Sequence, residues 1–126
     1  MKTKLDVLTS LKDALEAGKN PTRDEWDELF PDREEDDDYP RSMMAVSASE
    51  GWVGSVFHLF DAVFPGWHYT IKKLPTNEVQ VWIKSAYNIR QLGISAKHKC
   101  LPRAFLVAII KCLIKKEIGC EKPRRT

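Results

Sequence analysis

Basic side chains gather in one short stretch of the sequence, close to an aromatic residue. The six candidate binding residues of this stretch are Tyr87, Arg90, Lys97, His98, Lys99 and Arg103. Lysine and arginine donate hydrogen bonds to phosphate and carboxylate groups, and an aromatic ring can stack on a nucleotide base. The sequence therefore predicts a binding site for a nucleotide or another small anion in the basic segment 90–103.

The position of Lys97, His98 and Lys99 supports this prediction, because a predicted helix begins directly after them, near Pro102. The first turn of a helix exposes backbone N–H groups and the positive end of the helix dipole, which favour a bound anion. The competing interpretation is a solvated basic loop that balances the acidic residues 32–38. Trp52 and Trp82 are further candidates for the stacking ring. The residues leave these alternatives open.

Sequence motifs for catalysis and metal binding are absent. The three histidines, His58, His68 and His98, stand alone, and the sequence holds no Gly-x-Ser-x-Gly, phosphate-loop or His-Glu-x-x-His pattern. Cys100 with His98 or His68 is the pairing that could supply a nucleophile and a base. We expect no catalytic residue, no metal and no cofactor, and so a protein that is not an enzyme.

The cysteine pattern indicates free thiols. Cys100, Cys112 and Cys120 are odd in number and form no Cys-x-x-Cys pair, whereas disulfide frameworks and zinc knuckles need even or closely paired sets. The chain also has no apolar run near the ~20 residues that cross a bilayer. These features predict a reduced, cytoplasmic protein that does not bind a membrane.

Length and composition predict a single domain over residues 1–126. With 43% hydrophobic and 30% charged residues, the chain can bury a core. Charge is uneven: residues 1–64 hold 15 acidic and 7 basic side chains, and residues 65–126 hold 3 acidic and 13 basic ones. We expect an acidic loop over residues 31–46 and a flexible basic tail over 118–126. The net charge of only +2 argues against duplex DNA as a partner.

Hydrophobic periodicity predicts helices flanking a small sheet. Helical spacing predicts two helices over residues 3–17 and 23–30. A third predicted helix is capped by Ser47 and Glu50 and ends before Pro65. A fourth begins at Pro102 and ends before Gly119. Residues 67–72 and 79–83 alternate as strands do, and residues 84–96 can be read as a third strand or a loop.

These elements predict an α+β fold, with a small antiparallel sheet of two to three strands packed with amphipathic helices. We expect helices on both faces of the sheet, in an α/β/α sandwich. The apolar side chains of Trp67, Tyr69 and Ile71 should then lie sealed beneath those helices.

Several short motifs together resemble the phage ABA sandwich domain family. They are Phe64-Pro65-Gly66-Trp67-His68-Tyr69-Thr70 at the opening of the sheet, Leu101-Pro102-Arg103-Ala104 at the last helix, and the helix-to-turn segment 11–27. The resemblance implies an α/β/α sandwich and a phage or prophage origin, and it supplies no activity or catalytic residue. The lysines near the C-terminus depart from the alanine-rich helix of that family.

The resemblance and the absent motifs lead to two functional hypotheses. The first is a non-enzymatic phage accessory protein that binds a host protein in the cytoplasm of the host cell and blocks a host factor or defence system. The alternative is a nucleotide or small-anion binding module that uses segment 90–103. The sequence leaves the oligomeric state open.

Overall fold

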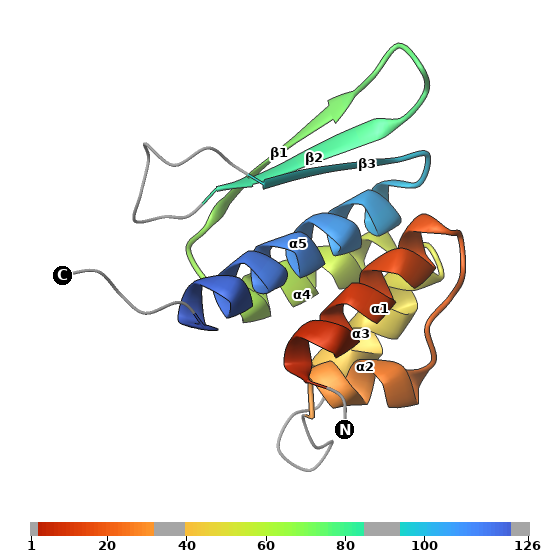
Figure 1. Cartoon of the computed structure of the whole chain (residues 1–126). Helices are drawn as coiled ribbons and strands as arrows, with labels where there is room; N and C mark the ends of the chain where they lie inside the picture. Colours follow the sequence, from red (N-terminus) through yellow and green to blue (C-terminus); the bar gives the residue numbers. More distant parts are fainter. Residues whose placement is uncertain (1–2, 32–39, 85–93, 122–126) are drawn as a thin grey trace, which may run out of the picture.

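The computed structural model describes residues 3–31, 40–84 and 94–121 of the chain. These residues form five helices and a three-stranded antiparallel sheet (Figure 1), which confirms the predicted α+β fold. The helices are α1 (Lys4–Glu16), α2 (Arg23–Leu29), α3 (Arg41–Ser49), α4 (Val53–Val63) and α5 (Leu101–Glu121), and the strands are β1 (His68–Lys73), β2 (Val79–Lys84) and β3 (Ile94–His98).

The first two helices begin where the sequence predicts, because each opens with a capping box. The Thr3 and Thr22 hydroxyls accept hydrogen bonds from the backbone N–H groups of Asp6 and Glu25, whose carboxylates accept the N–H groups of the two threonines in return. Gly18 follows α1 with a φ of 83°, a left-handed conformation that glycine adopts without steric cost.

The predicted third helix corresponds to α4, which begins later than predicted, and a further helix, α3, precedes it. Ser47 lies inside α3 and does not cap a helix, so the predicted cap and the predicted loop over residues 41–46 are both wrong. The helical conformation ends before Gly51, because its φ of 109° is incompatible with a helix, and α4 begins after Trp52. Small side chains explain the missed helix: α3 is buried through Ser42, Ala45, Ala48 and Ser49, which do not stand out as an apolar stripe.

Helix α5 lies at the centre of the fold, between the sheet and the other helices (Figure 1). Every residue from Ala104 to Ile110 is buried, as expected of a helix that is apolar on all sides. The layers therefore differ from the predicted α/β/α order: the described helices lie on one side of the sheet. The helix also runs past Gly119 to Glu121, so residues 118–121 of the predicted flexible tail are helical, and residues 122–126 lie outside the described residues.

The sheet has the order β1-β2-β3, with α5 packed against β2 and β3. Val81 and Ile83 on β2 are buried beneath it. The equivalent side chains of β1 are exposed, Tyr69 by 43% and Ile71 by 37%. The prediction that helices bury these two side chains is therefore wrong. The centroid of the Tyr69 ring still lies 5.1 Å from that of the Phe105 ring of α5, but β1 is an edge strand and α5 packs mainly on β2 and β3.

Candidate functional site

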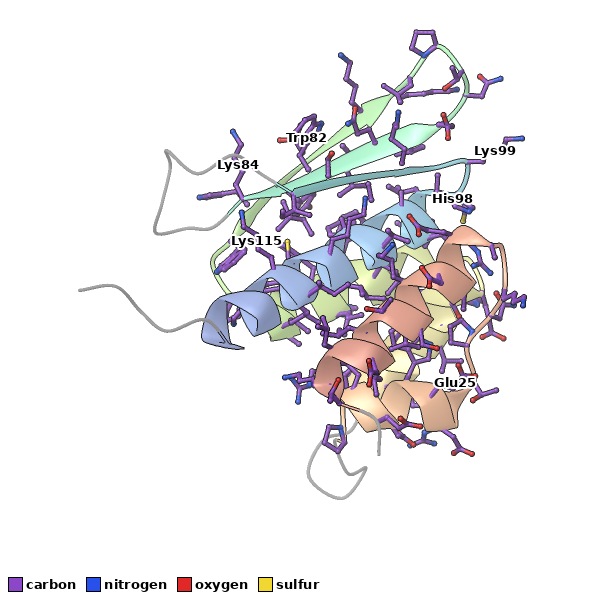
Figure 2. The ribbon with its side chains drawn as sticks, viewed as in Figure 1. Glu25, Trp82, Lys84, His98, Lys99 and Lys115 are labelled. Carbon is purple, nitrogen blue, oxygen red and sulfur yellow. The ribbon has the colours of Figure 1, made fainter. Side chains whose placement is uncertain are left out.

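Within the described residues, the members of the predicted basic site do not lie together. Lys97 and His98 are consecutive on β3, so their side chains point to opposite faces of the sheet. Lys97 pairs with Gln80 on the face turned away from the helices, whereas His98 pairs with Val79 on the helical side. Lys99 is exposed in the turn before α5, and Figure 2 shows it pointing away from the molecule. Tyr87 and Arg90 lie outside the described residues.

Arg103 is an internal structural residue and is only 9% exposed. Its Nη1 atom donates hydrogen bonds to the backbone carbonyl oxygens of Leu15, at 3.3 Å, and Lys19, at 2.8 Å. Its Nη2 atom donates to Oδ1 of Asn20. Leu15 lies in the last turn of α1, at the negative end of the helix dipole, and Lys19 and Asn20 lie in the turn that follows, so the buried guanidinium stabilises the helix end and holds that turn in place. The prediction that Arg103 binds an external anion is therefore wrong.

His98 also has an internal role, in the turn between β3 and α5. Its Nδ1 atom accepts a hydrogen bond from the backbone N–H of Cys100, at 3.1 Å. An Nδ1 atom that accepts a hydrogen bond carries no proton. Burial and the nearby charges of Arg103 and Lys99 lower the pKa of His98, outweighing Glu78, which raises it. A neutral His98 makes no ionic interaction with an anion, so it does not contribute the positive charge that the predicted site requires.

The face of the sheet turned away from the helices, here called the outer face, collects a different set of polar residues. The strand register aligns Lys72, Gln80 and Lys97 in one row, Thr70, Trp82 and Ser95 in a second, and His68 with Lys84 in a third. Figure 2 shows Trp82 and Lys84 on this side, with the helices on the other. Trp82 thus occupies the middle of the described outer face, with a hydroxyl on either side.

The outer face is open and positively charged. Trp82 is 36% exposed, and the lysines at 72, 84 and 97 are all exposed. None of the eight described positions carries an acidic side chain. Lys72 and Lys97 lie two strand spacings apart, about 10 Å between backbones, so their mutual repulsion is largely screened at physiological salt. The arrangement offers one indole ring, one imidazole, two hydroxyls, one amide and three lysine ammonium groups to a ligand.

Helix α5 holds this face in place from beneath. The ammonium group of Lys111 donates a hydrogen bond to the backbone carbonyl oxygen of Ser95, at 3.2 Å. Val81, Ile83 and Ala96 alternate with the outer residues and are almost fully buried against the helical layer. The backbones that carry Trp82 and Lys97 are therefore fixed before any ligand binds.

Two of the stacking candidates named from the sequence can be compared directly. Trp52 is 68% exposed, more than Trp82, but it precedes α4 and belongs to a different part of the molecule from the sheet. Trp82 alone of the two has lysines placed around it by a strand register. The alternation of four polar residues with apolar ones is the sequence signal for this face, although none of the four is among the predicted binding residues. They are Thr70, Lys72, Gln80 and Lys84.

No cluster of three or more histidine, cysteine or acidic residues suited to a metal ion occurs within the described ranges. In the same ranges, no helix combines the length and the apolar character that a membrane crossing requires.

Comparison of the chain with models of protein families, with curated proteins and with solved structures finds no match. The resemblance to the phage ABA sandwich domain family therefore stays a prediction.

Proposed function

We propose that the protein is a non-enzymatic binding protein that captures an anionic macromolecule on the outer face of its sheet. The observation that carries the proposal is the composition of that face: three exposed lysines surround Trp82, and none of the eight described positions is acidic. Clustered lysines attract a polyanion from a distance and release its counterions on contact. A flat, extended face suits a large partner better than a small anion, which needs an enclosing pocket.

Support for a non-enzymatic role comes from the residues best suited to covalent chemistry. The Nδ1 atom of His98 is already occupied by the backbone N–H of Cys100, so it is not available there to take a proton from a thiol. Cys112 is buried in the core, and burial raises the pKa of its thiol to about 12. Neither Cys100 nor Cys112, the two cysteines whose side chains are described, is placed as an activated nucleophile.

The narrower prediction, that a phage uses this protein in the host cytoplasm to block a host factor, stays a prediction. The outer face would serve a macromolecular partner in either case. The small-anion alternative loses support, because Arg103 and His98 are committed to contacts within the chain.

Retention on immobilised heparin, a polyanion without aromatic bases, tests the proposal. Lys72, Lys84 and Lys97 are changed together to glutamate. The control changes Lys4 on α1, Lys19 in the turn after α1 and Lys115 on α5, all exposed, by the same total charge. The wild-type protein and the control should be retained, and the outer-face variant should elute at much lower salt. Equal loss of retention in both variants would show that net charge alone governs binding and would overturn the proposal.

A further inference from the structure

We infer that the anionic macromolecule is a single-stranded nucleic acid, with one base stacked on the ring of Trp82. This inference rests on the function proposed above and names its partner class. It begins from the position of Trp82 in the central row of the outer face, between Thr70 on β1 and Ser95 on β3. A central tryptophan flanked only by short hydroxyl side chains presents its ring to an incoming flat group.

The charges around Trp82 lie where a backbone would pass. Lys84 follows Trp82 by two residues on the same strand and face, and Lys72 and Lys97 occupy the neighbouring row on either side of Gln80. Single-stranded nucleic acids bind proteins by combining stacked bases with cations that track the phosphates. The outer face supplies both within the span of three strands.

The hydrogen-bonding groups of the outer face are neutral and suited to base edges. Thr70, Ser95 and Gln80 can donate and accept hydrogen bonds, so they can serve the mixed donors and acceptors of a base. A ligand with acceptor oxygens only, such as inorganic polyphosphate, would make no use of the acceptor oxygens of these side chains or of the aromatic ring. The described residues therefore fit a base better than they fit a second charged group.

Two other classes of partner fit less well. A protein partner usually meets a patch that is apolar at its centre and depleted of lysine, whereas this face has one apolar side chain and three lysines. Duplex DNA hides its base faces inside the stack and admits a helix or a two-stranded ribbon into its major groove, not the face of a three-stranded sheet. The exposed ring of Trp82 is useful to a strand whose bases are free.

The test measures fluorescence anisotropy with labelled mixed-sequence DNA and RNA oligonucleotides of about 12 nucleotides, a length that one small domain covers. The wild-type protein is compared with Trp82→Leu and Trp82→Phe, and Trp52→Leu removes an exposed tryptophan away from the sheet as the matched control. Thermal unfolding of each variant verifies that it is folded.

We expect Trp82→Leu to weaken oligonucleotide binding by roughly 5- to 150-fold, because a lost stack typically costs that much. Trp82→Phe should retain part of the affinity for the oligonucleotide, and Trp52→Leu should bind it as the wild-type protein does. Retention on heparin should be the same for all these variants. Comparison of the DNA and RNA arms identifies which strand the face prefers.

Other outcomes separate this inference from the proposed function. If the protein is retained on heparin but Trp82→Leu binds the oligonucleotide as tightly as the wild type, the stacking inference is overturned. The polyanion-binding function would then remain in place. Equal affinity for duplex DNA, or for poly-glutamate, would also overturn it. Failure of the wild-type protein to bind either heparin or an oligonucleotide would overturn both.

Discussion

The side chains of Lys97 and His98 lie on opposite faces of the sheet although the two residues are consecutive on β3. Lys97 contributes charge to the open outer face, while His98 accepts a hydrogen bond from the backbone of Cys100 on the helical side. Neighbouring basic residues in this chain therefore serve different purposes, one in binding and one in stability. The two purposes can be separated by substitution.

Replacement of Lys97 by glutamate should weaken polyanion binding without destabilising the fold. The side chain is exposed and has no described role in the core, so the midpoint of thermal unfolding should change little. Lys99→Glu introduces the same charge two residues away, outside the strands, and is the matched control. Heparin retention should fall for Lys97→Glu more than for Lys99→Glu. Identical losses would mean that the outer face has no special role.

The stability of the protein should depend on the protonation of His98. Burial and the charges of Arg103 and Lys99 lower the pKa of His98 in the folded protein below its ordinary value of 6.5. The unfolded chain then binds the proton more readily, so this contribution to stability is complete above pH 6.5 and is lost as the pH falls below it.

Urea unfolding of wild type and His98→Asn at a series of pH values measures this contribution, because the asparagine amide oxygen can accept the Cys100 N–H without titrating. The difference in stability between the two proteins should shift in favour of His98→Asn as the pH drops. His58→Asn, at an exposed position on α4, is the matched control. A pH-independent difference would refute this role for His98.

Arg103→Met should destabilise the protein by about 3 kcal/mol, because it removes three hydrogen bonds that a buried guanidinium donates to the end of α1 and to the turn after it. The guanidinium now satisfies the carbonyl oxygens of Leu15 and Lys19. Urea unfolding measures the loss, and Lys99→Met is the exposed control. If Arg103→Met leaves stability unchanged but reduces anion binding, the internal role assigned to Arg103 is incorrect.

Alkylation of the native protein should reach Cys100 well before Cys112. Cys100 is half-buried, whereas burial raises the pKa of the Cys112 thiol from 9.0 to about 12. Since the thiolate is the reactive form, such a shift lowers the reactive fraction by about a thousandfold. Peptide mass spectrometry after iodoacetamide treatment should show this order, and urea should abolish it. Rapid modification of Cys112 in the folded protein would contradict its burial.

The sequence predicts β1, β2 and most helix boundaries because these depend on local patterns, whereas it left residues 84–96 open as a strand or a loop and β3 covers Ile94–His98. Alternation at residues 67–72 and 79–83 specifies which side chains share a face, and the capping box of Thr22 with Glu25 specifies where the second helix begins. Helix α3 was missed because its buried residues are alanine and serine, which carry no strong hydrophobic signal.

The candidate site was less predictable, because it depends on pairing between distant segments. Arg103 bonds with Leu15, 88 residues earlier, and no local pattern shows that a basic residue faces a helix end inside the protein. The row that joins Lys72 and Lys97 across Gln80 likewise exists only once the register of three strands is known. Segment 90–103 is basic as a sequence, but folding distributes its described charges over separate surfaces.

The most direct test of the binding surface is a two-dimensional ¹H–¹⁵N NMR titration of the whole chain with an unlabelled single-stranded oligonucleotide. We expect the indole N–H signal of Trp82 and the backbone signals of Thr70, Ser95 and Lys97 to shift together, while the indole signal of buried Trp26 stays in place. Shifts confined to α1, α2 or Trp52, with Trp82 unaffected, would contradict the assignment of the outer face as the binding surface.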